Sequence, residues 1–479
     1  MTERLISYYN LLYDRGLSAV DAVEQLTYLL VLKLEDEGRQ TAIDSEQPAL
    51  QGWAALTEKR AEPLVAQYTK TLAQRSSSAS GTAVDAVFAG AQNHVPDPAL
   101  LQRLVLDLFD VEQWSAYGSL LGEAYCELLQ RTMNERRSGA GQFFTPRPLI
   151  DAIVEVLQPE LTDTISDPAC GMGGFLQGAH EYLARHLTNP TSDELHQYRN
   201  QQRWGDELVL STARLATANL LLNRVVFAGQ PAPIAVRDAL AQQPDSQASL
   251  VLTHPPFGKH AEISGEGSRH TYRRSDFVAV SNDKQINFLQ HAMSLTAVRG
   301  RAAVVVPDNI LFALGTAETV RRDMLNRFDV HTILKLPTGT FPSASGVRAS
   351  VIFFDQHPNP AGEYPQTSRI WVYDLRSGRR FDPSDNPLNQ RDLNAFVSAY
   401  GPGLPRAERR ETENFRCFGI HDVLDHDHAS LDLTPPNKAS GEGSPAAPEE
   451  IAQGVLEDLQ IALQEFKELT AELLYDDAE

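Results

Sequence analysis

The chain has 479 residues with 42 Lys or Arg and 63 Asp or Glu, so its net charge is −21. Hydrophobic residues make up 42% of the chain, which is enough for a sizeable core. A length of this order predicts roughly two to three domains. Phosphate binding needs clustered Lys and Arg, so this chain is not expected to hold nucleic acid tightly by itself. If DNA is the substrate, a local basic patch or a basic partner must supply the attraction.

The three cysteines, Cys126, Cys170 and Cys417, are far apart and lack the spacing of metal ligands. This pattern favours a reduced, cytoplasmic protein with no disulfide framework and no metal site. No stretch approaches the ~20 consecutive apolar residues of a membrane span. The N-terminus lacks the basic and then apolar pattern of a signal peptide. We therefore expect a cytoplasmic location and no membrane partner.

Residues 1–138 are predicted to form an N-terminal helical domain. Val23, Leu26, Leu30 and Leu34 recur at helical spacing and give one apolar face. A second apolar-rich segment follows at 101–108, and residues 76–81 predict a loop between helices. The region contains no motif that is typical of catalysis or ligand binding. We expect a helical bundle that packs on a catalytic domain or closes over a ligand.

Residues 139–433 are predicted to form an α/β catalytic domain. Apolar strand-like runs alternate with helical segments, which is typical of a parallel sheet with crossover helices. Ligands of such sheets bind beyond the carboxyl ends of the strands. The predicted strands end at or just before the polar groups discussed below. The first leads through Ile165 into the glycine loop, and the others lie at 203–207, 234–238, 250–253 and 301–306, with a later one at 351–354.

The segment 141–176 is the centre of this domain. It contains Gly-Gln-Phe-Phe-Thr-Pro at 141–146 and Ser-Asp-Pro-Ala-Cys-Gly-Met-Gly-Gly-Phe-Leu at 166–176. Glycines at 171, 173 and 174 allow positive φ and close approach of a ligand to the backbone. The N–H groups that begin the following helix would face that ligand. A glycine turn alone is also typical of a plain tight turn, but the flanking residues favour a cofactor loop.

Acidic residues follow the next two predicted strands. Glu207 would accept hydrogen bonds from a ribose diol, because a carboxylate is a paired acceptor. Asp206 is adjacent, and only one of the two can face the ligand; a surface salt bridge is the alternative for either. Asp238 could accept from the exocyclic amine of an adenine or cap a helix. Phe143 or Phe144 would supply an aromatic wall on the other side of the cofactor.

The second motif that indicates a binding or catalytic site is Thr253-His254-Pro255-Pro256-Phe257. Two successive prolines stiffen the turn and restrict the residue before them. A rigid turn can hold carbonyl acceptors where a planar amine must be aligned. Phe257 then offers a face on which a flipped base can stack.

The end of the chain has a different composition. Residues 434–448 are rich in Pro, Gly, Ser and Ala, which predicts a linker. In 449–479, apolar residues at 455, 459, 462, 466, 469 and 473 form a seam of period 3.5. A helix packed on its own domain would show the same seam. The preceding linker favours a partner-binding helix.

Together these motifs resemble those of the modification (methyltransferase) subunits of type I restriction-modification systems, a family of S-adenosylmethionine-dependent adenine-N6 DNA methyltransferases. The resemblance covers nearly the whole chain, including stretches at 281–291, 304–312, 336–341 and 415–418. It implies a Rossmann-like class I methyltransferase sheet, preceded by a helical bundle and followed by a C-terminal helical tail. It also implies S-adenosyl-L-methionine as cofactor.

The resemblance assigns roles residue by residue. The catalytic residues that it implies, together with the proline turn, are His254, Pro255, Pro256 and Phe257. The cofactor-binding residues predicted by the motifs and the resemblance are Gln142, Phe143, Phe144, Thr145, Pro146, Asp167, Ala169, Cys170, Gly171, Met172, Gly173, Gly174, Phe175, Glu207 and Asp238. The implied mechanism is direct methyl transfer to the amine of a flipped base, without a metal or a covalent enzyme intermediate.

His254 departs from the family pattern, whose catalytic loop begins with Asn or Asp. In the family that Asn, with a proline-turn carbonyl, accepts hydrogen bonds from the target amine. A neutral His offers one ring-nitrogen acceptor with a different reach, and a protonated His offers none. Loss of one such bond costs about 10²–10³-fold in rate. Three hypotheses follow: weak or altered adenine methylation, a different acceptor, or a silent cofactor-binding scaffold in a DNA defence complex.

The resemblance further implies partners: DNA, a DNA-specificity subunit, a second copy of the chain and a separate translocase-nuclease subunit. The chain has no Gly-x-x-x-x-Gly-Lys-Ser/Thr phosphate loop, so neither ATP hydrolysis nor DNA cutting is assigned to it. Cytosine N4 is an acceptor served by related loops, and adenine is favoured on the resemblance alone. A dinucleotide-dependent oxidoreductase is disfavoured because the loop is not Gly-x-Gly-x-x-Gly and because the proline turn would be unexplained.

Overall fold

The computed structural model describes residues 1–41, 52–78, 80–95, 97–135, 145–257, 272–341, 347–358, 365–376, 381, 386–424 and 427–433. Gln142, Phe143 and Phe144 lie outside the described residues, as do the predicted linker at 434–448 and the predicted C-terminal helix at 449–479.

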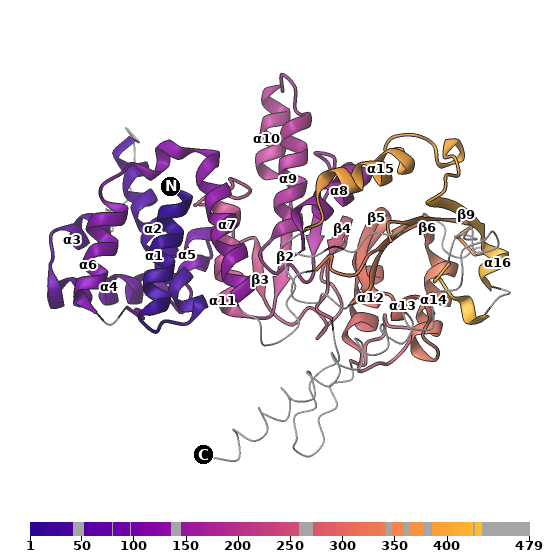
Figure 1. Cartoon of the computed structure of the whole chain (residues 1–479), viewed down its shortest axis with the longest axis horizontal. Helices are drawn as coiled ribbons and strands as arrows, with labels where there is room; N and C mark the ends of the chain where they lie inside the picture. Colours follow the sequence, from indigo (N-terminus) through magenta and orange to yellow (C-terminus); the bar gives the residue numbers. More distant parts are fainter. Residues whose placement is uncertain are drawn as a thin grey trace, which may run out of the picture.

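The described part of residues 1–135 is helical apart from its connections, as predicted (Figure 1). Its helices are α1 (Thr2–Asp14), α2 (Ala19–Thr41), α3 (Trp53–Thr57), α4 (Ala61–Ser76), α5 (Ala83–Phe88), α6 (Pro98–Gln102) and α7 (Ser119–Glu135), with a π-helical segment at Arg103–Phe109 and a 3-10 turn at Trp114–Tyr117. In α2, Val23, Leu26 and Leu30 are buried and Leu34 is half-buried, so the predicted apolar face is confirmed. The apolar segment at 101–108 is divided between α6 and the π-helical segment.

The strands that the structure describes form one nine-stranded sheet. They are β1 (Ile165–Asp167), β2 (Arg203–Glu207), β3 (Ile234–Val236), β4 (Ala248–Thr253), β5 (Thr296–Pro307), β6 (Asp329–Leu336), β7 (Ala349–Asp355), β8 (Arg369–Asp374) and β9 (Phe415–Gly419). Their order is β3-β2-β1-β4-β5-β7-β6-β8-β9. The strand predicted to enter the glycine loop at Ile165 and those predicted at 203–207, 234–238, 250–253, 301–306 and 351–354 are all present, although β3 already ends at Val236.

The sheet is mostly parallel, with one reversed strand, β7, inserted near its middle and a second, β9, at its end. The strands from β3 through β5 run parallel, and β7 is antiparallel to both β5 and β6. Consequently the carboxyl ends of β1 to β6 all lie at one edge. The register sets the neighbours at this edge, since Asp167 pairs with Gly205 and Thr253 pairs with Val304.

Helices cover both faces of the sheet, as an α/β domain requires. The helices α8 (Arg147–Leu157), α9 (Gly174–His186) and α15 (Gln390–Tyr400) lie above it in Figure 1, and α12 (Lys284–Leu295), α13 (Asn309–Phe312) and α14 (Thr316–Arg327) lie below it. The remaining helices are α10 (Ser192–Asn200), α11 (Leu210–Leu222) and α16 (Ile420–Leu424), with 3-10 turns at Arg406–Glu408 and Asp427–Ala429. None of the described helices is long and apolar enough to cross a membrane.

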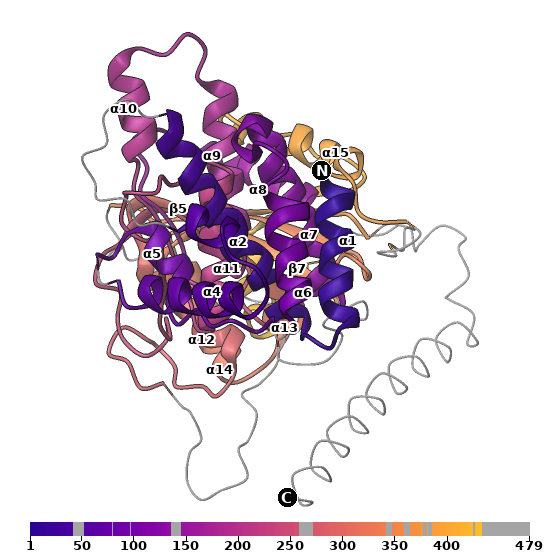
Figure 2. The same ribbon diagram turned by 90° about the vertical axis from the view of Figure 1, so that its left-hand side faces the viewer.

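The N-terminal helices pack against the β3 end of the sheet through α11 (Figures 1 and 2). Their hydrophobic core includes Leu215, Ala218 and Leu222 of α11. Arg214 of α11 forms an ion pair with Glu24 at 3.0 Å. Met172, in the predicted cofactor loop, belongs to the same core. The helical region is therefore in direct contact with the loop that the sequence places at the site.

Candidate cofactor site and catalytic loop

The glycine-rich loop connects β1 to α9 and lies at the carboxyl edge of the sheet. Gly171 and Gly173 have φ values of +51° and +78°, which residues with a Cβ adopt only at a cost. The loop is closed by its own backbone, because Gly173 N–H donates to the Cys170 carbonyl at 2.8 Å. Among the described residues, a Cβ on Gly171 would meet no atom within 4 Å. The loop therefore leaves open space beside Gly171, at the first of its glycines.

The loop also packs closely on the neighbouring strand. Cys170 N–H donates to the Asp206 carbonyl at 3.0 Å. A Cβ on Gly205 of β2 would lie 2.6 Å from the Cys170 Cβ. Glycine at 205 is thus required by the close approach of loop and strand. Cys170 and Phe175 are buried in the hydrophobic core, so only their backbone groups can contribute to a site.

Asp206 and Glu207 end β2 and have different partners. Asp206 forms an ion pair with Arg237 at 2.7 Å. Glu207 instead accepts from the Val209 N–H at 2.9 Å, and the N–H groups of Leu208 and Gly171 also contact its carboxylate. Burial raises the pKa of Glu207, and these three N–H groups oppose the rise. Of the two acidic residues, Glu207 is the one that faces the glycine loop.

Two further aspartates lie near this edge. Asp167, the last residue of β1, is buried and accepts from the Ala169 N–H at 3.1 Å. Burial raises the pKa of Asp167 to about 7, and the nearby Glu207 carboxylate adds to the rise. Asp238 accepts from the Leu240 N–H at 2.9 Å and from the Tyr272 hydroxyl at 2.7 Å. Asp238 therefore caps the turn that follows β3 while also holding Tyr272.

His254 follows the last residue of β4 and is enclosed by other side chains. Its Nδ1 lies 2.8 Å from Oγ1 of Thr145, a residue 109 positions earlier in the chain. The His254 ring centroid is 5.0 Å from that of Phe257 and 4.7 Å from that of Phe341. Only 7% of His254 is exposed, and burial lowers its pKa to about 3. The imidazole is therefore neutral at physiological pH.

The proline turn is held from outside the loop. Gln285, near the start of α12, donates from Nε2 to the Pro256 carbonyl at 3.2 Å. Asp283 caps the same helix by accepting from the N–H groups of Gln285 and Ile286. The position of Gln285 is thus fixed at a helix N-terminus, and with it the direction of the Pro256 carbonyl.

The structure brings most of the described candidates to one edge of the sheet. Thr145 contacts His254, and Pro146 directly precedes α8. Helix α8 packs closely on the start of α9, because a Cβ on Gly174 would lie 2.8 Å from the side chain of Ile150. The interpretation from sequence gave no role to Phe341, Gln285, Tyr272 and Arg237. The first two lie in stretches that resemble the family, which was the available signal. No local pattern marks Tyr272 or Arg237.

Comparison with known proteins places this geometry in a family. The family model described as N-6 DNA methylase matches residues 117–430. The chain is 34% identical to the methylase subunit of the type I restriction enzyme StySPI from Salmonella potsdam, over 83% of this chain and 76% of that protein. It is also 34% identical to the EcoKI methylase subunit from Escherichia coli K12, over the same shares of the two chains.

Solved structures agree with the sequence relatives. A chain from a study of the assembly and conformational transition of a type I restriction-modification system matches with a TM-score of 0.72 and 26% identity, covering 100% of this chain and 98% of that one. The EcoKI methylase subunit matches with a TM-score of 0.53 and 28% identity, covering 98% and 96%. The expected methyltransferase fold is confirmed, and the silent-scaffold hypothesis gains no support. This chain belongs to the N-6 DNA methylase family, among the methylase subunits of type I restriction enzymes.

Proposed function

We propose that this chain transfers a methyl group from S-adenosyl-L-methionine to adenine N6 in DNA, as the modification subunit of a type I restriction-modification complex. Family membership supports the reaction class. The observation that carries the proposal is the placement of the glycine loop, Glu207 and the His254–Phe257 turn at one edge of the sheet. The cofactor and the base would meet at this edge.

The residues at the edge fit the proposed cofactor. Open space lies beside Gly171. The Glu207 carboxylate has about four acceptor positions, of which backbone N–H groups use three, so capacity remains for a ribose hydroxyl. Leu208 and Val236, at the ends of β2 and β3, are 67% and 50% exposed and offer apolar surface for an adenine ring. When bound, S-adenosylmethionine supplies an electrophilic methyl group on a sulfonium.

The catalytic loop would orient the target amine. A neutral imidazole whose Nδ1–H donates to Thr145 Oγ1 carries its acceptor on Nε2, which is buried in the structure. This tautomer would let His254 replace the family Asn once the target amine reaches Nε2. The Pro255–Pro256 turn would supply the second acceptor from its backbone. Phe257 lies edge-to-face with Phe341 at 88° and 5.8 Å, which fixes the ring on which the flipped base would stack.

The charge of the chain bears on its partners. A net charge of −21 opposes tight DNA binding by this chain alone, so we propose that a DNA-specificity subunit reads the sequence. A second copy of the chain and a translocase-nuclease subunit complete the proposed assembly.

Methyl transfer tests the proposal directly. Labelled methyl would be followed onto unmodified host-type DNA, using the chain copurified with its specificity subunit, beside His254→Asn and His254→Ala versions. We expect label on adenine N6 with the unsubstituted chain and with His254→Asn. We expect a loss of about 10²–10³-fold with His254→Ala, because an acceptor is removed. Label on another atom, or no transfer by the unsubstituted chain despite cofactor binding, would refute the proposal.

The pH profile tests the protonation state of His254. Because burial lowers its pKa to about 3, the imidazole is neutral throughout the range pH 5 to 9. The unsubstituted chain and His254→Asn should therefore show parallel rate profiles in that range. An inflection near the ordinary histidine pKa, about 6.5, in the unsubstituted chain alone would contradict a neutral acceptor.

A further inference from the structure

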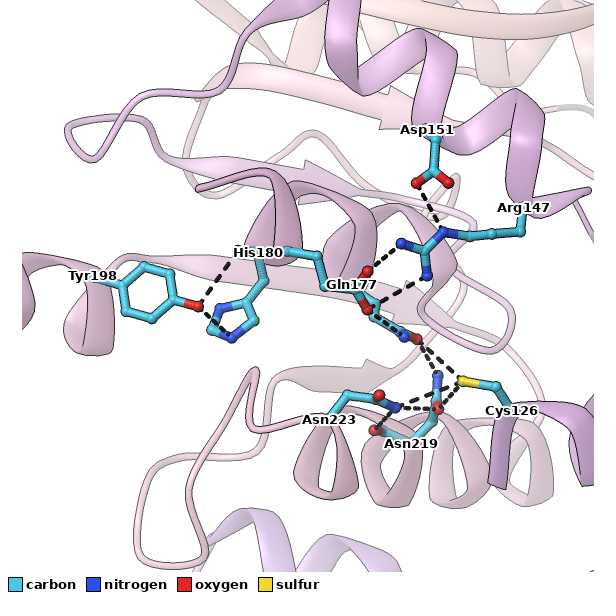
Figure 3. A network of polar contacts seen from close by, with 9 residues as sticks. Cys126, Arg147, Asp151, Gln177, His180, Tyr198, Asn219 and Asn223 are labelled. Atoms are coloured by element: carbon cyan, nitrogen blue, oxygen red, sulfur yellow. Dashed lines mark hydrogen bonds and ion pairs between the residues drawn. The ribbon is translucent and has the colours of Figure 1, made fainter. Parts of the chain in front are cut away.

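A polar network with a buried centre and a partly exposed end lies behind the glycine loop, where helices from both parts of the chain meet (Figure 3). It joins Cys126 of α7, Arg147 of α8, Gln177 of α9 and Asn219 of α11. The proposed methyl transfer leaves these side chains without a role. Burying amide groups is unfavourable unless every donor and acceptor is matched, so their arrangement requires a physical reason.

Asn219 is the centre of the network and its amide is fully paired. Its Nδ2 donates to the Met172 carbonyl at 3.0 Å and to Gln177 Oε1 at 3.1 Å. Its Oδ1 accepts from Asn223 Nδ2 at 2.9 Å and from the Cys126 thiol at 3.1 Å. Asn219 is 3% exposed. If the amide were reversed, its oxygen would face two other oxygens, so the network fixes the direction of the donor group.

The Met172 carbonyl belongs to the loop that would bind the cofactor. Met172 lies between Gly171 and Gly173, both of which have positive φ. Glycine on each side leaves the intervening peptide groups freer to rotate than in other sequences. The hydrogen bond from Asn219 holds the carbonyl of the Met172–Gly173 peptide toward α11. The N–H of the same peptide then donates to the Cys170 carbonyl.

The network continues to the other half of the proposed site. Gln177 Nε2 donates to Glu181 Oε1 at 2.7 Å, and Glu181 forms an ion pair with Arg147. Arg147 begins α8, two residues after Thr145, whose hydroxyl contacts His254. A continuous series of polar contacts therefore links the glycine loop to the segment that contacts the catalytic loop.

We propose that Asn219 is a positioning residue for methyl transfer, which sets the Met172 carbonyl and thereby holds the glycine loop in the conformation that binds the cofactor. The inference rests on the proposed function, because it assumes that the loop binds S-adenosylmethionine. Through the Cys126 thiol, helix α7 of the N-terminal region contacts the side chain that controls the loop.

The Asn219→Asp variant tests this role with almost no change in shape, because it replaces the amide nitrogen with oxygen. At pH 8 we expect the full chain to bind S-adenosylmethionine about tenfold more weakly, measured by calorimetry without DNA, since two buried acceptors lose their donor. With the specificity subunit present, KM for the cofactor should rise about tenfold. The kcat at saturating cofactor should stay within about threefold.

A second expectation separates positioning from general damage. Protonation gives the new carboxyl group one donor, so the affinity of the Asp variant, relative to that of the unsubstituted chain at the same pH, should recover in part between pH 8 and pH 6. The comparison at each pH removes the titration of Asp167 and Glu207, which both chains share. Misfolding would not be reversed in this way. Thr217→Val is the matched control, because Thr217 is buried in the same helix and donates only to the Ala213 carbonyl. It should bind cofactor as tightly as the unsubstituted chain.

The outcomes are distinguishable. Unchanged cofactor affinity of Asn219→Asp at pH 8 would overturn this inference and leave the proposed function intact. If the unsubstituted chain binds no S-adenosylmethionine, the proposed function fails and the inference fails with it. If Asn219→Asp does not fold, Asn219→Ala replaces it, with the same expected loss of affinity and the same result, unchanged affinity, as refutation.

Discussion

The two halves of the sheet end in polar groups at the same edge, but those groups are held differently. In the half from β3 to β4, Glu207 and Asp167 accept from backbone N–H groups of their own loops. In the half from β5 to β9, carboxylates instead form ion pairs with Arg or Lys side chains. Asp308 pairs with Arg376 at 3.1 Å, and Lys335 pairs with Asp432 at 2.5 Å.

This difference indicates where a ligand can bind. A carboxylate held by a few N–H groups is fixed in place and keeps acceptor capacity for another molecule. A carboxylate in an ion pair with Arg or Lys has its charge already matched within the protein. We infer that the first half of the edge serves the ligand and the second half serves stability. The two roles can be tested separately by substitutions in each half.

The largest effect on stability is expected at the Lys335–Asp432 pair. Lys335 is completely buried, so Asp432→Ala removes the hydrogen-bonded partner of a buried charge. We expect a loss of about 3 kcal/mol in the free energy of unfolding, measured as a lower melting temperature, with cofactor affinity unchanged. Adding Lys335→Met removes the buried charge and should restore most of the stability. A fall in cofactor affinity would show that the two halves are not independent.

Glu207→Gln should weaken cofactor binding with little effect on melting. A neutral amide lacks the charge that strengthens hydrogen bonds to hydroxyl donors, which is worth about 1.5–3 kcal/mol, or roughly 10- to 150-fold in affinity. Calorimetric titration with S-adenosylmethionine measures the change. Affinity equal to that of the unsubstituted chain would remove Glu207 from the site.

Gly173→Ala should weaken cofactor binding by about tenfold, because the positive φ costs a residue with a Cβ about 1–2 kcal/mol. The new methyl group would also lie 3.2 Å from the side chain of Leu220, which must then move. Gly229→Ala is the control, since a Cβ there meets no atom of the described residues within 4 Å and φ is not positive. Equal affinities of the two variants in the same titration would contradict the role of the loop conformation.

The smallest effect is expected at Asp206, although it is adjacent to Glu207. Its partner Arg237 is partly exposed, and such pairs contribute about 1 kcal/mol or less. Asp206→Asn should change cofactor affinity by less than about twofold. A loss comparable to that of Glu207→Gln would reverse the assignment of the two carboxylates.

The strands and turns in the first half of the edge could be predicted from the sequence, whereas much of the second half could not. Each strand from β1 to β4 is followed by a polar, proline or glycine turn, and β3 and β4 are mainly apolar, so the pattern is local. In β6, the polar residues His331, Thr332 and Lys335 are all buried. A segment that contains such residues is not predicted from its sequence to be a central strand. The insertion of β7 between β5 and β6 is a tertiary pairing that no local pattern encodes.

The site shows the same division. The glycine loop and the proline turn are contiguous motifs, and the sequence was sufficient to predict them. The partners of His254 come from Thr145 and Phe341, which are distant in the chain. Whether Asp206 or Glu207 faces the loop depended on Arg237, which occupies Asp206. These choices are made by packing between elements and became visible only in the structure.

The contacts of the last described residues, 427–433, determine how the structure would respond to a pulling force. Arg321 donates to the carbonyls of His428 and Ala429, Leu431 N–H donates to the Leu311 carbonyl, and Asp432 pairs with Lys335. These bonds anchor this segment to α14, α13 and β6 in turn. A pulling force applied beyond Leu433 would be borne first by the ion-paired half of the sheet, and the glycine loop would be shielded from that load.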